Sequence, residues 1–597
     1  MLYDAIKVFE KKQNAEAERG FSEEATALEC RTKLLIDNYI PKDGTYVLIT
    51  MDADFRLETP LEIKYDKKTN ELRGRTEPCF NYVRYLDYNS KLININKPID
   101  TKKVIHSNQI YAFFVKKESL AEKKLTVDVI DGYYNTLSAP ENKYKGKGKK
   151  LYQQALEELG EPDHEALEKI RAWIRDWIAN PEKLPIDYTG KDYLKLFFVY
   201  SDEKRTKELY ERENQRYVIP NIYNNNDYNV EVNHTILGMP SNNLGLNAKK
   251  PFLENKQRKT PAPYLIDREQ VMLQSQFFDY LWGHACKGNV NVYIDLDEEE
   301  IYAVSDKDED KNIPPIKNGL FLRIKKGKEV EILDWDIVMD VSPNLSKTFY
   351  FKPIVKATAE GKNYGQCNQT AKLSAIIDEV FFDKYLGYNY FTDAMDLPQM
   401  DGKLKYVLLT YRSRIFSWLY KTPQCDMKTV ISEMALKLIN NKIANGYYGR
   451  ACEQLNLLLS LEDYFKENYE MEELMRTVQD NFKKHIDSKE EWDFEDEEYY
   501  YAVGQLINYF LSLSKAAKKP FSMANQFLNA DNDSLIKEKL CQMFIRYDHA
   551  LDLEKDSRAK NVISHVLMYK PKCNKVMQRE LIAGLTAVSA FYAKKKE

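Results

Sequence analysis

Hydrophobic and polar residues follow different periods in two parts of the chain. Up to about residue 400, short runs rich in β-branched and aromatic residues predict strands, and stretches with a helical period predict helices between them. The predicted strands include residues 46–51, 61–65, 111–115, 290–294, 301–304, 320–324 and 330–338, and the predicted helices include 1–40, 151–180 and 267–285. This part of the chain is therefore expected to be a mixed α/β region.

From about residue 401 onward the strand pattern ends and the helical period continues without interruption. Apolar residues recur on one face in 427–443, 498–513 and 576–591. About seven or eight helices are expected here, packed as a bundle. We predict an α+β fold class, with a mixed α/β N-terminal region (1–400) followed by an all-α C-terminal helical bundle (401–597).

Two stretches of the mixed region lack a clear period. Residues 215–265 are dense in Asn, Pro, Gly and basic residues, and a loop this long is usually either functional or disordered. Their aromatic and aliphatic content favours an ordered, functional loop. Residues 142–150 form a second candidate loop, which contains five lysines and no acidic residue.

Composition narrows the class of protein without naming a function. A chain of 597 residues is too long for one hydrophobic core, so about two to four domains are expected. The net charge of −4 shows no global basic field, although 42 tyrosines against 6 tryptophans suit interfaces and base stacking. The same tyrosine content would follow equally from the codon bias of an AT-rich genome.

Cysteines and hydropathy give the expected compartment. The eight cysteines are scattered with no C-x-x-C pair, which disfavours a zinc site and a disulfide framework and points to the cytoplasm. The first residues become charged too early for a signal peptide, and no long apolar run predicts a membrane segment.

A search for catalytic motifs gives no enzyme. The chain lacks G-x-x-x-x-G-K-[ST] and G-x-S-x-G, and its closest approach to H-E-x-x-H, at 164–168, lacks the second histidine. Acidic runs such as 295–300 are typical of solvated surface. We therefore predict no catalytic residue, no metal site and no cofactor.

The strongest candidate chemistry is nucleic-acid binding by the part of the long loop near residues 238–259. Side-chain amides can read base edges and basic side chains contact phosphates. The candidates are Asn242, Asn243 and Asn247 for bases and Lys249, Lys250, Lys256 and Arg258 for phosphates. From composition alone, a solvated surface loop explains these residues equally well.

A second set of lysines lies near the end of a predicted helix. Lys515, Lys518 and Lys519 could contact DNA phosphates. Basic residues at a helix C-terminus also interact favourably with the helix dipole, which explains the cluster without any ligand.

Four segments together resemble a known family. They are NNLGLNAKKPFLENKQRKTPAPYLID, YYYAVGQLINYFLSLSKAAKKP, FLNADNDSLIKEKLCQMFIRYDHAL and LIAGLTAVSAFY, between about residue 238 and the C-terminus. The set resembles the large subunit of type I-B CRISPR Cascade, Csh group. The resemblance implies recognition of the protospacer-adjacent motif in duplex DNA, stabilisation of the displaced strand, and a docking surface for a separate helicase–nuclease.

The same resemblance implies the partners. They would be a guide CRISPR RNA, target double-stranded DNA, and the backbone, handle-capping and small subunits of the complex. Guide pairing reads most of the target, so the subunit needs no catalytic residue. Some small subunits of the family are translated from within the large-subunit gene, for which Met427 ranks first and Met400 second as an internal start.

Other readings remain open at this point. An RNA-modifying enzyme with a helical accessory domain would need a cofactor pocket, and a polymerase-like signalling subunit would need a Gly-Gly-Asp-Asp motif, which is absent. A structural RNA–protein scaffold would leave the lysine-rich loop as plain surface.

Overall fold

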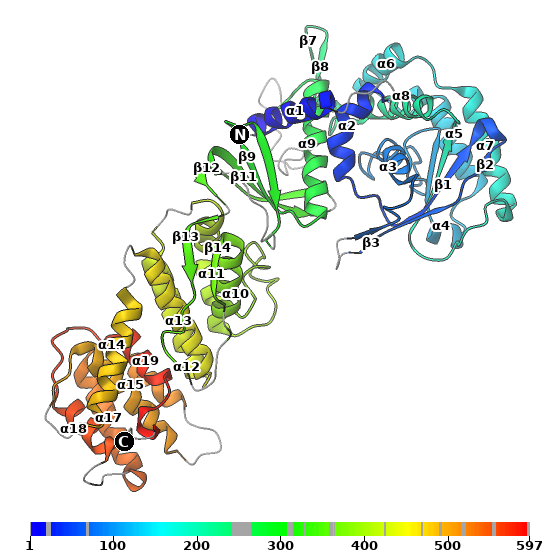
Figure 1. The fold of residues 1–597 in the computed structure, drawn as a ribbon. Helices are drawn as coiled ribbons and strands as arrows, with labels where there is room; N and C mark the ends of the chain where they lie inside the picture. The colour runs from blue at the N-terminus through cyan, green and yellow to red at the C-terminus, as the bar shows by residue number, and fades with distance from the viewer. Residues whose placement is uncertain are drawn as a thin grey trace. The chain divides into compact units, whose positions relative to one another are not determined.

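Sheets lie in the N-terminal half of the chain and mostly helices in the C-terminal half (Figure 1). The computed structural model describes the chain apart from residues 1, 20–24, 67–70, 242–263, 307–314, 328, 343, 358–361, 363, 423–425, 467–469, 489–491, 515–520, 552–553, 555–556 and 594–597. The predicted α+β class is confirmed.

The chain divides into two compact units. One comprises Met1–Ser305 with Gly319–Ile337, and the other comprises Asp306–Asn318 with Val338–Glu597. The sequence pattern predicts a boundary between residues 400 and 401, where the strand pattern stops. The observed division follows contacts rather than element type, because the last strands and α10 (Thr370–Phe382) pack with the C-terminal helices.

The N-terminal unit is a mixed layer structure. Its helices are α1 (Leu2–Arg19), α2 (Ala27–Asn38), α3 (Phe80–Tyr88), α4 (Lys117–Ala121), α5 (Val127–Ser138), α6 (Lys147–Leu159), α7 (His164–Ala179), α8 (Glu203–Asn221) and α9 (Arg268–Cys286). Its strands are β1 (Gly44–Thr50), β2 (Arg56–Leu57), β3 (Leu61–Asp66), β4 (Glu71–Arg73), β5 (Ala112–Lys116), β6 (Tyr193–Val199), β7 (Val230–Val232), β8 (Thr235–Leu237), β9 (Asn291–Asp295), β10 (Glu300–Val304), β11 (Ile316–Lys326) and β12 (Val330–Val341), the last two of which cross between the units.

The main sheet has the strand order β4-β3-β1-β6-β5, with β2 paired to β1. Its centre is the parallel pair β1 and β6, whose sequences GTYVLIT and YLKLFFV are almost continuously apolar. Such runs suit strands that are covered on both faces. Gly44 opens β1 opposite Tyr193, and a Cβ atom there would lie 2.2 Å from the Tyr193 carbonyl oxygen.

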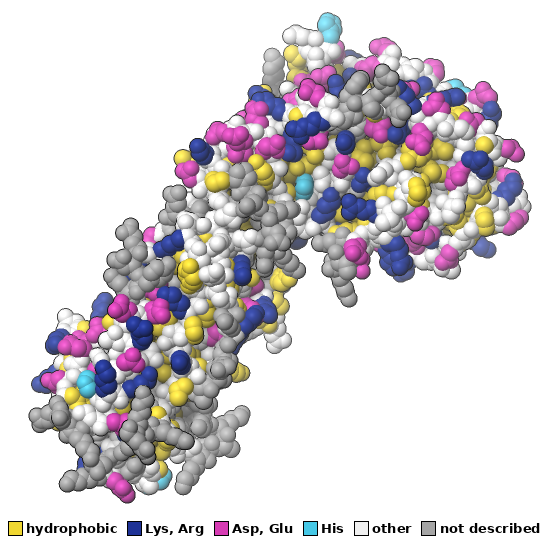
Figure 2. Space-filling model, viewed as in Figure 1, with side chains coloured by type: hydrophobic (Ala, Val, Ile, Leu, Met, Phe, Trp, Pro, Cys, Tyr) yellow, Lys and Arg dark blue, Asp and Glu magenta, His cyan; other side chains and the backbone are white. Residues whose placement is uncertain are grey.

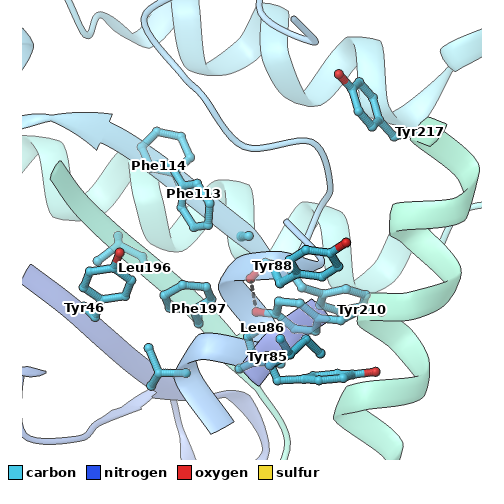
Figure 3. Close-up of a cluster of buried hydrophobic side chains, with 14 of the residues drawn as sticks. Tyr46, Tyr85, Leu86, Tyr88, Phe113, Phe114, Leu196, Phe197, Tyr210 and Tyr217 are labelled. Carbon is cyan, nitrogen blue, oxygen red and sulfur yellow. Dashed lines mark hydrogen bonds between the residues drawn. The ribbon is translucent and has the colours of Figure 1, made fainter. Parts of the chain in front are cut away.

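Aromatic side chains fill the space between this sheet and its helices. Figure 3 shows Tyr46, Phe114 and Phe197, from β1, β5 and β6, together with Tyr85 and Tyr88 from α3. The centroid of the Phe197 ring lies 5.3 Å from that of Phe114 and 6.0 Å from that of Tyr46. Most of the largest fully buried side chains are tyrosines, so part of the tyrosine content belongs to cores.

Three local predictions need correction in this unit. The helix expected over 151–180 is two helices, α6 and α7, because the chain turns at Gly160, whose φ is 72°. Helix α6 also takes in residues 147–150 of the expected basic loop, and α8 extends into the stretch expected to be an ordered loop. Helix α8 was missed because its sequence is largely polar and its apolar period is weak.

The second sheet of the unit has the order β10-β9-β11-β12. Strand β9 pairs antiparallel with β10, which follows it after a short turn, and with β11 on its other side. Helix α9 packs on α1 and α2, and α1 also contacts β10. These contacts join the second sheet to the core of the first.

The C-terminal unit is built mainly from helices. It contains β13 (Asn344–Tyr350) and β14 (Gln366–Gln369), then α10, α11 (Gly402–Tyr420), α12 (Lys428–Ala444), α13 (Tyr448–Phe465), α14 (Glu470–His485), α15 (Asp496–Ser512), α16 (Asn525–Leu528), α17 (Asp533–Tyr547), α18 (Arg558–Met568) and α19 (Gln578–Thr586). Helix α11 begins at the predicted change of period, where the Asp401 side chain accepts hydrogen bonds from the backbone N–H groups of Lys403 and Leu404.

Helix α15 is almost wholly buried and contacts α19 backbone to backbone. A Cβ atom on Gly504 would lie 2.1 Å from the Leu581 carbonyl oxygen, and one on Gly584 would lie 2.0 Å from that of Tyr501. The buried Gln505 side chain donates to the Gly584 carbonyl oxygen at 2.6 Å and accepts from the Ala590 N–H at 2.9 Å. Only glycines permit this approach.

Replacing Gly504 with Ala should therefore lower the free energy of unfolding by about 1–3 kcal/mol, because the added methyl group has no space. The control is Gly449→Ala near the start of α13, where an added Cβ meets nothing within 4 Å, and its change should stay within about 0.5 kcal/mol. Chemical denaturation of the full chain measures both. Equal stability of the two variants would contradict the close helix contact.

Candidate nucleic-acid interface

The two ends of segment 242–263 are fixed side by side in the N-terminal unit. Gly238 and Ile266 exchange backbone hydrogen bonds of 2.9 and 3.0 Å, and the Asn224 N–H donates to the Met239 carbonyl oxygen at 2.8 Å. Gly238 is required at this place because a Cβ atom would lie 2.3 Å from the Tyr223 ring. The candidate loop thus leaves and re-enters the fold at one point.

Lysine side chains secure the chain that leads into this segment. The Lys97 ammonium donates to the carbonyl oxygens of Asn221 and Tyr223, and that of Lys147 donates to those of Asp227 and Asn229 at 2.9 and 2.5 Å. Burial lowers the pKa of Lys97 to about 8. These lysines meet carbonyl groups instead of carboxylates, so they hold the backbone without cancelling the positive charge.

The basic segment around the start of α6 lies against the same stretch of chain. Helix α6 contacts α8 and the turn η4 (Asn226–Tyr228), and the Lys150 ammonium lies 2.9 Å from a Glu231 carboxylate oxygen. Lys145 and Lys149 are exposed and have no carboxylate partner among the described residues. The two basic segments that the sequence singled out are therefore neighbours at their described parts.

A cleft of about 770 Å³ opens beside the same anchor point. Its wall begins at Pro240 and Ser241, the last described residues before the candidate loop. The remaining walls come from α2, β6, α8, α9 and the chain after α3. The lining also includes Lys42, His106, Phe114 of β5, and Glu329 with Val330 at the start of β12. The volume falls within the range typical of small-ligand sites.

A buried ion pair lies next to the cleft, whose lining includes Lys195. The Lys195 ammonium on β6 lies 2.5 Å from an Asp87 carboxylate oxygen on α3, and the two side chains are 4% and 0% exposed. Tyr39 donates to the other carboxylate oxygen at 2.9 Å. Burial lowers the pKa of Lys195, and the Asp87 carboxylate opposes that shift.

A second carboxylate, that of Asp279, lies in one wall of the cleft and also accepts hydrogen bonds from a lysine and a tyrosine. Asp279 on α9 accepts from the Lys91 ammonium at 2.7 Å and from the Tyr88 hydroxyl at 3.1 Å. The Lys91 ammonium also lies 4.2 Å from the centroid of the Tyr88 ring and 5.2 Å from that of Tyr39. This wall is aromatic and its charges are balanced.

Lys42 adds a positive charge to the cleft. It is exposed, its ammonium lies 5.3 Å from the centroid of the Tyr193 ring, and it forms no ion pair with a described carboxylate. Partial burial lowers its pKa, the Asp87 carboxylate opposes that shift, and Lys91 and Lys116 add to it. The His106 Nδ1 atom lies 2.9 Å from the Tyr193 hydroxyl oxygen. Burial is the main cause that lowers the pKa of His106.

The residues predicted from sequence to bind nucleic acid lie outside the described part of the chain. They are Asn242, Asn243, Asn247, Lys249, Lys250, Lys256 and Arg258, and likewise Lys515, Lys518 and Lys519. The cleft residues were missed by sequence analysis. The run YVRYLDYNSKLININK at 82–97, which alternates tyrosines, amides and lysines, is the signal that could have drawn attention to them.

The surface of the N-terminal unit carries charges of both signs. Figure 2 shows Lys and Arg side chains interspersed with Asp and Glu over its visible face, so the positive character of the candidate interface is local. The described residues contain no cluster of three His, Cys, Asp or Glu side chains suited to hold a metal ion. Among the helices that the structure describes, none is long and apolar enough to cross a membrane.

Comparison with known proteins adds no relative. No protein-family model matches the chain, and no significant match occurs among curated proteins or solved structures. The proposed function of this chain therefore rests on its own residues.

Replacing Lys195 with Met should lower the free energy of unfolding by about 3–5 kcal/mol, because the Asp87 carboxylate would stay buried without its cation. Adding Asp87→Asn to that variant should recover much of the loss, since the neutral amide can still accept from Tyr39. Equilibrium unfolding of the single and double variants measures the coupling. Purely additive losses would show that the two side chains do not depend on each other.

Proposed function

We propose that this chain is the large subunit of a type I-B CRISPR RNA-guided DNA surveillance complex. In this role it recognises the protospacer-adjacent motif, stabilises the displaced DNA strand and offers a docking surface for a separate helicase–nuclease. The observation that carries the proposal is the backbone pairing between Gly238 and Ile266, which flank segment 242–263. This pairing lies beside the aromatic cleft and beside Lys145 and Lys149, which have no carboxylate partner among the described residues.

The anchor supports a reading role for the segment. A loop that reads base edges must present its amides in a fixed register, and the Gly238–Ile266 pairing fixes both of its ends. Lys145 and Lys149 offer positive charge for phosphates close to this Gly238–Ile266 pairing. Asn242, Asn243 and Asn247 would then contact bases, with Lys249, Lys250, Lys256 and Arg258 on the backbone.

The proposal includes partners and a compartment. The subunit would act in the cytoplasm with a guide CRISPR RNA, double-stranded target DNA and the backbone, handle-capping and small subunits. It would carry no catalytic residue and no cofactor. The alternative is a structural RNA–protein scaffold, for which Lys145 and Lys149 would be solvated surface.

The C-terminal unit would contact the displaced strand, with Lys515, Lys518 and Lys519 as candidate phosphate contacts. A separate small subunit beginning at Met427 would keep α12 but lose α10 and α11, which pack on α13 and α12. Met427 is itself 3% exposed, just before α12. A start at Met400 keeps α11 and leaves less apolar surface exposed, so it fits the fold better.

Tagged full-length chain, purified from cells that carry its gene and the adjoining genes, should co-isolate a guide RNA and the other subunits. In that complex, replacing Asn242, Asn243 and Asn247 with Ala should weaken binding of motif-bearing duplex DNA about tenfold or more, because each bidentate amide–base contact discriminates by about 1–3 kcal/mol. Electrophoretic mobility shifts measure the affinity.

Duplex DNA without the motif is the control, and its weaker affinity should not change. Equal loss on both duplexes would show that the segment contacts only the backbone. Purification of the chain without RNA or partner subunits would make the proposed function wrong.

Replacing Lys145 and Lys149 with Ala should make DNA binding by the complex less dependent on salt. Each lost phosphate contact reduces the slope of log affinity against log salt by about one. The control is Lys123→Ala with Lys191→Ala, two exposed lysines that line no part of the cleft. The same slope in both double variants would show that Lys145 and Lys149 are not part of the DNA interface.

A further inference from the structure

We propose that the cleft of the N-terminal unit binds one unpaired nucleotide, with its phosphate on Lys42 and its base among the tyrosine and amide side chains of the walls. The proposal rests on the proposed function only for the source of that nucleotide. The cleft chemistry that supports it is independent of segment 242–263.

Charge in the cleft favours an anion at one place. Lys195 and Lys91 are already paired with Asp87 and Asp279. Lys42 has no such partner among the described residues, and the Asp87 carboxylate near it is held by Lys195 and Tyr39. A phosphate at Lys42 would stabilise the ammonium form of this lysine, which its partial burial disfavours.

The remaining walls suit a base rather than a second anion. Tyr39 and Tyr193 are partly exposed and present aromatic rings, on which any base can stack. Gln215 lines the cleft, and its amide makes no hydrogen bond among the described residues. An unengaged amide beside aromatic rings is the combination by which proteins read splayed-out bases.

Two polar atoms in the cleft have no hydrogen-bond partner among the described residues. They are the Trp282 indole N–H and the Ser241 hydroxyl, both buried. Buried polar groups are normally hydrogen-bonded, so an orphan donor in a cleft indicates a site for an acceptor. Base carbonyl and ring nitrogen atoms are acceptors of this kind.

The dimensions of the cleft limit the ligand. A volume of about 770 Å³ accommodates one nucleotide. Aromatic rings and side-chain amides reach the face and edge of a base only when it is splayed out, so the proposed ligand is unpaired. Its source could be a strand of RNA, a strand of DNA or a free mononucleotide, and these share the chemistry described.

The test uses the full-length chain and tetranucleotides that carry one 4-thio-pyrimidine. Probes of RNA and of DNA are titrated by fluorescence anisotropy, then cross-linked with light and mapped by mass spectrometry. AMP and inorganic phosphate serve as competitors. Lys42→Gln should weaken binding about tenfold, because it removes a charge-assisted contact to phosphate.

A second variant and a control accompany it. Gln215→Ala should weaken binding several-fold with no loss of folding, because this side chain bonds to no described residue. Lys123→Gln, which alters an exposed lysine outside the cleft, should leave affinity unchanged. Cross-links should map to peptides that contain Tyr39 or Tyr193.

The outcomes identify the source or overturn the proposal. Tighter binding of the RNA probe indicates the guide, tighter binding of the DNA probe indicates the displaced strand, and full competition by AMP indicates a free nucleotide. Unchanged affinity in Lys42→Gln, competition by phosphate equal to that by AMP, or cross-links outside the cleft would each overturn it. An RNA-loaded complex that binds its target normally while these tests fail would leave the proposed function intact.

Discussion

The buried contact between Lys195 and Asp87 is the constraint on which the N-terminal unit depends. It joins the central strand β6 to α3 across 108 residues of sequence, in a place where neither charge reaches solvent. Because an unpaired charge there costs several kcal/mol, strand and helix are restricted to one relative position. Tyr39, Tyr88 and Lys91 are arranged around that position, and together they form the cleft.

The same unit holds together the residues that flank segment 242–263, whose composition most suggests nucleic-acid binding. Backbone pairing between Gly238 and Ile266 brings its ends together, and Lys97 and Lys147 bind the carbonyl groups that precede it. By binding carbonyl groups, Lys97 and Lys147 stabilise the chain that precedes this segment and still contribute positive potential. In the proposed function, these residues would combine structural support with attraction for phosphate.

The C-terminal unit depends on a different constraint, which is steric. Helices α15 and α19 approach so closely at Gly504 and Gly584 that no side chain fits between them. Buried Gln505 then satisfies the end of α19. Helices α10 and α11 complete this unit, so the compact helical body begins before the change of sequence period near residue 401.

Local hydrophobic period is enough to predict the fold class and many of the elements, because each helix or strand carries its period within its own residues. Composition also marks residues 142–150 and 215–265 as chemically unusual. The polar composition of α8 hides its period, and a change of element type near residue 401 does not record which elements pack together. The tertiary structure was needed to show that Lys42, Tyr193 and Lys195 line one cleft and that α6 contacts the turn Asn226–Tyr228. Such meetings depend on packing between elements far apart in the chain, and no local period records them.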